Sequence, residues 1–430
     1  MNAPLPQQPP VSRRYAGFVL TLLFLLYMLD YTDRMIIVSL FPFLKSDWGL
    51  SDTQCGLLVS TVYWSILVFS FPVSILVDRW SRKKSIGLMA MLWSLATLAC
   101  AFTANFGQLF AARTAIGLGE AGYAPGGTAM ISALYPQEKR ARVLGLWNAS
   151  IPLGSALGIG IGGFVAERYG WRHAFGLVAV PGMVAALLCF FIKDYRTVEL
   201  SRAVGGGLDS RRVRLGWAEV AKGFAHNRTL LLNNLGFAAN VFVTTSLLTW
   251  LPTYFHREYG LTMSQAGVKG GMVMMLAIVG APLGGYLADR WLLTKPTARL
   301  LFPAITSLMT GVLLFAAFAF FKGPVQYVVL LAAGVSAVAF VPAAVAVTQD
   351  VVHPGLRATS LSLNVIIQHL LGSSLGPTFV GAMSDAHGLA SGLLCLPIFG
   401  LLAAGLFLWA SRYYERDLAE VESAEMRFEA

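Results

Sequence analysis

Charged residues are scarce in this chain, and long polar stretches are almost absent. Asp, Glu, Lys and Arg make up 13% of the 430 residues, whereas a soluble domain carries about 25%. Hydrophobic residues reach 56%, with a mean hydropathy of +0.64. Because this apolar content recurs along the whole chain, the composition predicts a helical protein that crosses a membrane many times.

Sequence patterns for metal and disulfide chemistry are also missing. The four cysteines are scattered, each inside or beside an apolar run: Cys55, Cys100, Cys189 and Cys395. The chain has no CxxC pair and no Cys/His ligand spacing. We therefore expect neither a metal site nor a disulfide framework.

Motifs for enzyme chemistry are absent as well. The chain has no P-loop, no Ser/His/Asp set and no HExxH, so an ATP-driven pump or a membrane hydrolase would lack its machinery. Gly158, Gly160 and Gly162 alternate as in a dinucleotide loop, but no strand precedes them and no acidic ribose partner follows. These glycines instead favour close helix packing. We expect no enzyme activity and no cofactor.

Twelve apolar stretches approach the roughly 20 residues that one membrane crossing requires. The first six span approximately 16–42, 52–77, 85–104, 107–133, 141–166 and 173–192. The second six span approximately 229–255, 263–289, 298–321, 325–349, 357–384 and 389–412. The sequence therefore predicts an all-α integral membrane protein with twelve transmembrane helices in two six-helix halves.

One long hydrophilic stretch, from Lys193 to Arg228, separates the two sets of spans. It contains three consecutive glycines and the basic cluster Arg211-Arg212-Val-Arg214, a composition typical of a linker on a membrane surface. The predicted organisation is a disordered cytoplasmic lead, an N-terminal half, a cytoplasmic linker, a C-terminal half and a cytoplasmic tail. These parts cover residues 1–15, 16–192, 193–228, 229–412 and 413–430.

Lys and Arg are distributed unevenly between the loops on the two sides. Placing Arg13 and Arg14 in the cytoplasm puts most basic clusters there too. Few positive residues remain in the opposite loops: Lys45, Arg168, Arg172, Arg257 and Lys322. Since basic residues favour the cytoplasmic side, we predict that both termini are cytoplasmic. The net charge is +10, but the positive residues lie in short loops between apolar stretches, where they orient the chain in the membrane. We therefore expect no nucleic-acid partner.

Two charged residues interrupt the predicted fourth span. Arg113, Gly117 and Glu120 lie at positions i, i+4 and i+7, which places them on one helix face. A charge at the centre of a membrane helix costs about 3 kcal/mol, so such residues are usually paired and functional. This face predicts a polar pathway rather than contact with lipid, and it indicates a transporter.

The first span carries Asp30, Asp33 and Arg34, and their spacing puts Asp30 on one side with both others. We predict that Asp30 and Glu120, with Asp33 as a further candidate, bind and release protons. Arg113 and Arg34 would be the charges that switch between these carboxylates and an anionic substrate, which biases the equilibrium between inward- and outward-open states. The alternative is that the charges form static pairs that hold helices together.

Other polar and aromatic side chains within the spans are possible lining of a central cavity. They are Tyr31, Tyr63, Trp64, Tyr123, Trp147, Asn240, Thr244, Lys269, Asn364 and Gln368. The alternatives are hydrogen bonds between helices for the amides and hydroxyls, snorkelling for the lysine, and packing or interfacial anchoring for the aromatic residues.

An internal repeat joins the two halves. Ser74-Ile-Leu-Val-Asp78-Arg79-Trp80 ends the second span, and Gly285-Tyr-Leu-Ala-Asp289-Arg290-Trp291 ends the eighth. Two copies six helices apart are the mark of duplicated halves. With Arg82 and Lys83, the first copy resembles the signature Gly-x-x-x-Asp-Arg-x-x-Arg-Lys of the major facilitator superfamily, with Ser74 in place of glycine. The second copy lacks the trailing basic pair.

This resemblance covers nearly the whole chain. It implies two halves that rock around a central cavity and give alternating access. It also implies a conformational lock in the loop after the second span and its repeat, made of Asp78, Arg79, Arg82, Lys83, Asp289 and Arg290. The alternative is a plain basic loop that only sets topology.

Four segments resemble the spinster-type lipid transporters within this superfamily. They are Tyr31-Thr-Asp33-Arg34, Arg113…Gly-Glu120-Ala-Gly-Tyr-Ala-Pro125, Tyr135-Pro136-x-x-Lys-Arg140-Ala-Arg142 and Ile151-Pro152-Leu-Gly154-Ser-Ala-Leu-Gly158. Sugar-acid symporters resemble parts of the same pattern. The spinster resemblance implies that the substrate is a lysophospholipid or sphingoid-phosphate-like amphiphile. The intramembrane carboxylates favour coupling of its transport to protons. We expect a monomer, and the lack of a large periplasmic domain or glycosylated loop favours a bacterial inner membrane. A proton-linked sugar-acid or organic-anion symporter, and a non-coupled lipid scramblase or lipid-binding receptor, are the alternatives.

Overall fold

The computed structural model describes residues 12–79, 82–135, 137–192, 224, 226–353 and 356–428. The regular elements in these ranges are helices. Most of the predicted lead and most of the predicted linker lie outside the described residues. The predicted end of the lead at residue 15 is wrong, because α1 already begins at Arg13.

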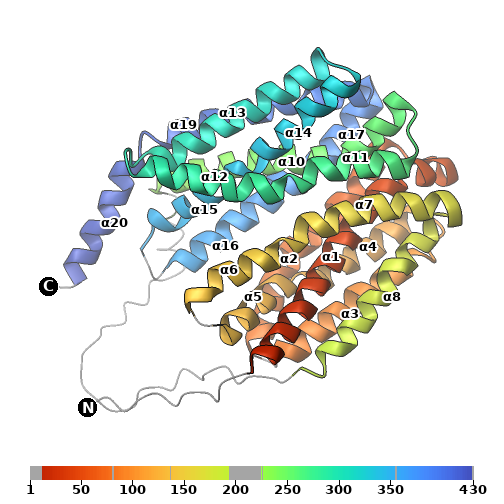
Figure 1. The fold of residues 1–430 in the computed structure, drawn as a ribbon, viewed down its shortest axis with the longest axis horizontal. Helices are drawn as coiled ribbons and strands as arrows, with labels where there is room; N and C mark the ends of the chain where they lie inside the picture. Colours follow the sequence, from red (N-terminus) through yellow and green to blue (C-terminus); the bar gives the residue numbers. More distant parts are fainter. Residues whose placement is uncertain are drawn as a thin grey trace.

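Helices of the N-terminal half follow the predicted spans closely (Figure 1). They are α1 (Arg13–Trp48), α2 (Asp52–Arg79), α3 (Arg82–Cys100), α4 (Phe106–Glu120), α5 (Tyr123–Leu134), α6 (Gln137–Asn148), α7 (Ser150–Tyr169) and α8 (Trp171–Cys189). Short breaks separate α4 from α5 and α6 from α7, so each of these pairs makes up one predicted span.

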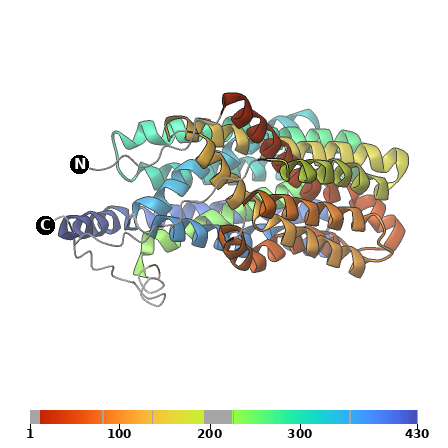
Figure 2. The ribbon, with the colours of Figure 1, turned by 90° about the horizontal axis from the view of Figure 1, so that it is seen from below.

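Helices of the C-terminal half repeat this plan. They are α10 (Arg228–Tyr259), α11 (Met263–Met275), α12 (Ala277–Leu292), α13 (Ala298–Ala319), α14 (Gly323–Ala339), α15 (Val341–Asp350), α16 (Arg357–Ile367), the π-helix η2 (Gln368–Ser373), α17 (Gly376–His387), α18 (Leu389–Leu394), α19 (Leu396–Ala410) and α20 (Tyr414–Phe428). Helix α20 occupies the predicted tail and extends away from the bundle (Figure 2).

Ten helices of the described chain are long and apolar enough to cross a membrane. The two predicted spans outside this set are α3, which starts with three basic residues, and α4–α5, which is interrupted after Glu120. Both pack within the N-terminal half, α3 against α8 and α4 against α2 (Figure 1). The predicted class, an all-α membrane protein in two halves, is confirmed, and the arrangement is consistent with the predicted twelve spans.

The helix ends follow local sequence signals. Side chains of Ser12 and Asn105 accept hydrogen bonds from the first turns of α1 and α4, and Thr262 forms a capping box with Gln265 at the start of α11. Gly49 ends α1 with φ 64°, a left-handed conformation that favours glycine.

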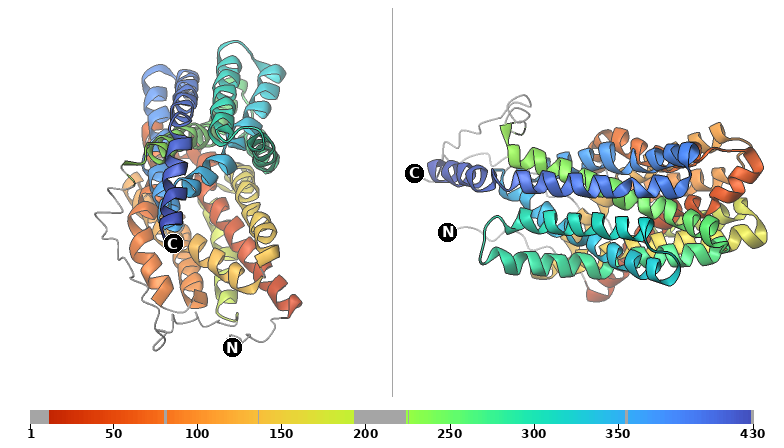
Figure 3. Two further views of the ribbon diagram at one scale, coloured as in Figure 1. Left: turned by 90° about the vertical axis from the view of Figure 1, so that its left-hand side faces the viewer. Right: turned by 90° about the horizontal axis from the view of Figure 1, so that it is seen from above.

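The two halves form two layers in the end-on view (Figure 3). We use the term distal end for the end of the bundle that holds the α1–α2, α10–α11 and α17–α18 connections, and proximal end for the opposite one. The ribbons of the halves lie close together at the distal end and diverge toward the proximal end (Figure 1).

Small residues on α7 allow neighbouring helices to approach closely, both within the N-terminal half and across to the other half. A Cβ on Gly158 would lie 2.4 Å from the carbonyl oxygen of Thr32 on α1. One on Gly163 would lie 2.8 Å from the carbonyl oxygen of Met263 on α11, in the other half. The predicted role in close helix packing is therefore confirmed for Gly158 and Gly162, whereas a Cβ on Gly160 would meet only Val268 at 3.8 Å.

Candidate functional site

The charged residues of α1 and α4 meet in one buried cluster. Their exposed fractions are 8% or less, and the cluster consists of Asp30, Asp33, Arg34, Arg113 and Glu120. The structure thus brings together the two sets of charges that the sequence singles out separately.

Arg34 is shared by two carboxylates. Its Nη2 lies 3.1 Å from Oδ2 of Asp30, and its Nε lies 2.8 Å from Oε2 of Glu120. The Nε contact is an ion pair without hydrogen-bond geometry, and the carboxylate oxygens of Glu120 have no hydrogen-bond partner among the described residues. The guanidinium also lies 4.7 Å from the ring centroid of Tyr31. One cation therefore balances two anions here.

Arg113 is held by carbonyl groups. Its Nε donates to the carbonyl oxygen of Leu58 on α2 at 2.6 Å, and its Nη2 donates to that of Arg34 at 3.3 Å. Nη1 has no partner, and no ion pair to Arg113 occurs within the described helices. The expected Arg113–Glu120 pair is replaced by Arg34–Glu120. Seven residues of helix separate Arg113 from Glu120 by about 10.5 Å along the axis, so Arg34 of the neighbouring helix is the nearer cation.

Asp33 differs from the other two carboxylates. The hydroxyl of Thr97 on α3 donates to its Oδ2 at 2.5 Å. Oδ1 has no hydrogen-bond partner in the part of the chain that the structure describes. The sequence argument puts Asp30 and Glu120 first as proton carriers, but Asp33 is the carboxylate that this geometry leaves without an ion pair.

The cluster has an odd number of charges. Three carboxylates and two guanidinium groups sum to −3 + 2 = −1 when all are ionised. A buried charge without compensation is costly. Binding of one proton makes the cluster neutral, so the arrangement is suited to proton uptake and release.

An aromatic cluster lies beside these charges. Tyr27, which the sequence argument did not single out, stacks on Trp147 with 4.4 Å between ring centroids. Tyr123 and Trp147 both donate to the carbonyl oxygen of Leu23, at 2.6 and 3.2 Å, and their exposed fractions are 1% and 2%. These two rings therefore pack inside the N-terminal half, as in the packing alternative. Tyr31 is half-buried.

Tyr63 and His369 connect the two halves. Their rings stack with centroids 5.6 Å apart, and both lie within electrostatic range of Arg34. His369 belongs to η2, and its Nδ1 has no partner among the described residues. A π-helical turn often marks a functional site. His369 was not among the residues predicted from the sequence, because its approach to Tyr63 depends on how the halves pack. Trp64, the next residue on α2, is half-buried.

The polar residues of the C-terminal half fall into two groups. Asn364 donates to Oδ1 of Asn234 at 2.8 Å and accepts from Gln368. The predicted residues Asn364 and Gln368 thus form, with Asn234, a chain of hydrogen-bonded amides, and His369 follows Gln368 in the sequence. Asn240 instead joins α10 to Ser307 of α13 at 2.8 Å.

Two further residues predicted to line the cavity have local partners. Thr244 donates to the carbonyl oxygen of Val241 at 3.2 Å. Lys269 is exposed, with its Nζ 5.5 Å from the ring centroid of Tyr327 on α14. Both contacts lie within the C-terminal half, and they match the packing and snorkelling alternatives.

The predicted conformational lock is described only in part. The side chains of Asp78, Arg79 and Arg82 lie outside the described residues, and Lys83 is half-buried. In the repeat, Asp289 is exposed and Arg290 donates to the hydroxyl of Tyr286 at 3.3 Å.

A proximal contact in the C-terminal half was not predicted. Arg299 and Asp350 form an ion pair, and the hydroxyl of Tyr414 donates to Asp350 at 3.0 Å. Since these residues belong to α13, α15 and α20, the contact attaches the C-terminal helix to the bundle.

A bundle of membrane-crossing helices in two repeated halves, with ionisable groups buried in its interior, is the architecture of a secondary transporter. The sequence model of the Major Facilitator Superfamily matches residues 23–377. The chain belongs to this superfamily, whose members are transporters rather than enzymes, and it is an integral membrane transporter.

The similar proteins include spinster homologues and a hexuronate transporter. Protein spinster homolog 1 of Xenopus laevis is 27% identical over 96% of this chain and 84% of the relative. The hexuronate transporter of Bacillus subtilis (strain 168) is 28% identical over 91% of this chain and 92% of the relative.

Two solved structures share the fold. A bacterial homologue of the human lysosomal transporter spinster, inward-facing and unoccupied, has a TM-score of 0.82 at 24% identity, covering 95% of this chain and 99% of that one. A D-xylose–proton symporter has a TM-score of 0.73 at 16% identity, covering 91% and 97%.

Proposed function

We propose that this transporter moves a lysophospholipid or sphingoid-phosphate-like amphiphile across a bacterial inner membrane by proton-coupled alternating access. The observation that carries the proposal is the sharing of Arg34 between Asp30 and Glu120, with Asp33 unpaired beside them. Such a cluster responds to one proton and to one anion, and both responses act on the same cation.

Proton coupling works through the balance of charge. A proton on Asp33 or Glu120 removes the excess negative charge of the cluster and weakens the hold of the carboxylates on Arg34. The guanidinium is then available to an anionic headgroup. Release of the proton restores the internal pairs and favours release of the substrate, so each protonation state biases a different conformation.

The substrate class follows from the groups around Arg34. A guanidinium binds phosphate and carboxylate groups through several parallel hydrogen bonds. Tyr31, Gln368 and His369 offer hydroxyl, amide and imidazole groups nearby, and His369 comes from the opposite half. The spinster relatives support the resemblance of the sequence to spinster-type transporters, and that resemblance favours a lipid as the carrier of the anionic group.

The remaining features of the proposal concern topology. The excess of Lys and Arg in the loops on one side of the membrane supports a cytoplasmic location for both termini. We propose that the protein works as a monomer, and that the loop residues Asp78, Arg79, Arg82 and Lys83 lock the proximal side when it closes, with Asp289 and Arg290 as their counterparts.

A proton-linked sugar-acid symporter is the second candidate, because the hexuronate transporter of Bacillus subtilis (strain 168) is as similar to this chain as the spinster relatives are. The same cluster would serve a carboxylate of a sugar acid. The two candidate substrates differ in what carries their anionic group, which is a hydrocarbon chain in the lipid and a hydroxylated sugar in the sugar acid.

Transport in liposomes separates these functions. The purified protein is reconstituted, a proton gradient is imposed, and the movement of lysophospholipids, sphingoid phosphates and hexuronates is followed. We expect gradient-driven movement of a lipid, and its loss in Glu120→Gln. Movement of hexuronate alone would favour the symporter, whereas equal lipid movement with and without the gradient would indicate a scramblase. Asp47→Asn, at an exposed distal carboxylate, is the matched control.

A further inference from the structure

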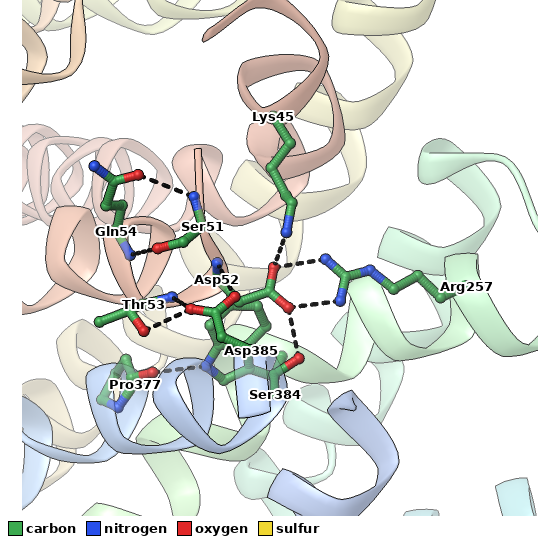
Figure 4. A network of polar contacts seen from close by, with 10 residues as sticks. Lys45, Ser51, Asp52, Thr53, Gln54, Arg257, Pro377, Ser384 and Asp385 are labelled. Carbon is green, nitrogen blue, oxygen red and sulfur yellow. Dashed lines mark hydrogen bonds and ion pairs between the residues drawn. The ribbon is translucent and has the colours of Figure 1, made fainter. Parts of the chain in front are cut away.

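Asp52 is the centre of a polar network that joins the halves at the distal end (Figure 4). It is the first residue of α2, and its side chain is only 4% exposed. Arg257, near the end of α10, donates from Nη1 to Oδ2 and from Nη2 to Oδ1, at 2.7 Å each. This is the bidentate geometry in which arginine binds a carboxylate most strongly.

Two more donors complete the coordination of Asp52. Nζ of Lys45, from α1, lies 2.5 Å from Oδ1, and the hydroxyl of Ser384, from α17, lies 2.5 Å from Oδ2. The carboxylate thus receives hydrogen bonds from both halves of the protein, and both of its oxygens are satisfied (Figure 4).

A second carboxylate bridges in the opposite direction. Asp385 of α17 accepts hydrogen bonds from the backbone N–H groups of Asp52 and Thr53, at 2.8 Å each, and from the hydroxyl of Thr53 at 2.6 Å. These N–H groups belong to the first turn of α2, which has no intrahelical acceptors. The C-terminal half therefore supplies the N-terminal cap of a helix in the other half.

The backbones are in direct contact below this network. A Cβ on Gly56 would lie 2.5 Å from the carbonyl oxygen of Pro377, and one on Gly381 would lie 2.5 Å from that of Asp52. The hydroxyls of Ser60 and Thr378 are 2.9 Å apart. Helices α2 and α17 are therefore closed against each other for more than two turns.

The charges of the network are balanced on each side of the seam. Lys45 and Asp52 belong to the N-terminal half, and Arg257 and Asp385 belong to the C-terminal half. Each half contributes one cation and one anion, so separation of the halves leaves each side neutral. A contact of this kind can open and reform without burying an unpaired charge.

We propose that Lys45, Asp52, Thr53, Arg257, Ser384 and Asp385 form a distal latch, a gate that holds the distal end shut and breaks each time that end opens. The inference rests on the alternating-access part of the proposed function only. The strength of the latch sets the fraction of molecules whose distal end is closed, whatever substrate the protein carries.

Cys55 is a native reporter of the latch. It is 0% exposed, it lies three residues after Asp52 on the same face of α2, and its thiol is within electrostatic range of Lys45 and Arg257. The other cysteines are replaced by alanine, at Cys100, Cys189 and Cys395. The rate at which a maleimide labels Cys55 in detergent-solubilised protein then measures how often the distal end opens.

We expect Asp52→Asn and Arg257→Gln to label Cys55 about tenfold to a hundredfold faster than the parent, because each removes charge-assisted hydrogen bonds. Arg257→Lys keeps the charge but not the bidentate geometry, and it should be intermediate. Arg172→Gln is the matched control. Arg172 pairs with Asp47 at 3.8 Å at the same end but within the N-terminal half, so its labelling rate should stay at that of the parent.

Labelling rates equal to the parent in Asp52→Asn and Arg257→Gln would overturn the latch. So would equal acceleration by Arg172→Gln, which would mean general loosening. If the charge variants fail to elute as a single species, Ser384→Ala removes one donor and no charge, and we expect about twofold to tenfold faster labelling; no change there would also refute the proposal. The assay needs no substrate and no proton gradient, so it is independent of any failure of lipid transport.

Discussion

The distal latch and the central cluster contain the same kinds of groups, yet they are satisfied to different degrees. Both oxygens of Asp52 receive donors, and Asp385 caps a helix end. In the central cluster, by contrast, Oδ1 of Asp33 and Nη1 of Arg113 have no hydrogen-bond partner among the described residues. Buried polar groups without partners are costly, so they persist mainly where a site must change its state.

The two regions also differ in charge and in location. The latch is balanced and spans the two halves, whereas the cluster carries an excess carboxylate and lies within α1 and α4 of one half. A balanced contact across a seam is suited to holding a conformation. An unbalanced cluster inside a rigid half is suited to binding a proton or a ligand. Substitutions in the two regions should therefore differ in their effects on stability and on transport.

Arg34→Gln should have the largest effect on stability. It leaves Asp30 and Glu120 without a cation, and loss of one partner of a buried ion pair costs about 3–5 kcal/mol. Unfolding in denaturant, followed by tryptophan fluorescence in detergent, measures this change. Arg34→Lys, which retains the charge, should lose less. If Arg34→Gln unfolds at the denaturant concentration of the parent, Arg34 is not the hub of the cluster.

Arg113→Gln should have a smaller effect, about 1.5–3 kcal/mol, because Arg113 donates to carbonyl groups and pairs with no carboxylate at ion-pair distance in the described helices. The same unfolding measurement applies. A loss larger than that of Arg34→Gln would show that Arg113, rather than Arg34, is the main cation of the cluster.

Asp33→Asn should change stability by less than about 1 kcal/mol, since asparagine can still accept the hydrogen bond from Thr97 and removes an unpaired charge. It should nonetheless abolish gradient-driven transport in liposomes and spare exchange of substrate down its own gradient. Retention of proton coupling in this variant, together with its loss in Glu120→Gln, would assign the proton to Glu120.

Asp385→Asn should also have a small effect on stability, about 0.5–1 kcal/mol, because the side chain is exposed and acts as a helix cap. The effect should shrink at high salt, where exposed charges are screened. Thermal unfolding at low and high salt measures both. An effect as large as that of Arg34→Gln would remove the contrast between latch and cluster.

The sequence was sufficient to identify the members of the central cluster. Asp30, Asp33, Arg34, Arg113 and Glu120 are unusual at membrane depth, so their presence alone predicts that they lie together. Their pairing was not predictable, because it depends on the rotation of α1 against α4. A shift of α1 by one turn would move Arg34 away from Glu120.

The latch escaped prediction for a different reason. Asp52, Arg257 and Asp385 lie at helix ends, where charged residues are ordinary. Asp52 is separated from Arg257 by 205 positions in the sequence and from Asp385 by 333. His369 was missed for a related reason, since its contact with Tyr63 is formed between the two halves.

The spans, the repeated halves and the residence in a membrane could be read from the sequence alone, because the length of an apolar stretch is a local property of the chain. The set of buried charges could be read in the same way, because a charge inside an apolar span is costly wherever it occurs. The tertiary structure decided which carboxylate lacks a cation and which distal residues hold the halves together. Those outcomes depend on helix rotation, depth and packing across the seam, which are set by contacts between residues far apart in the sequence.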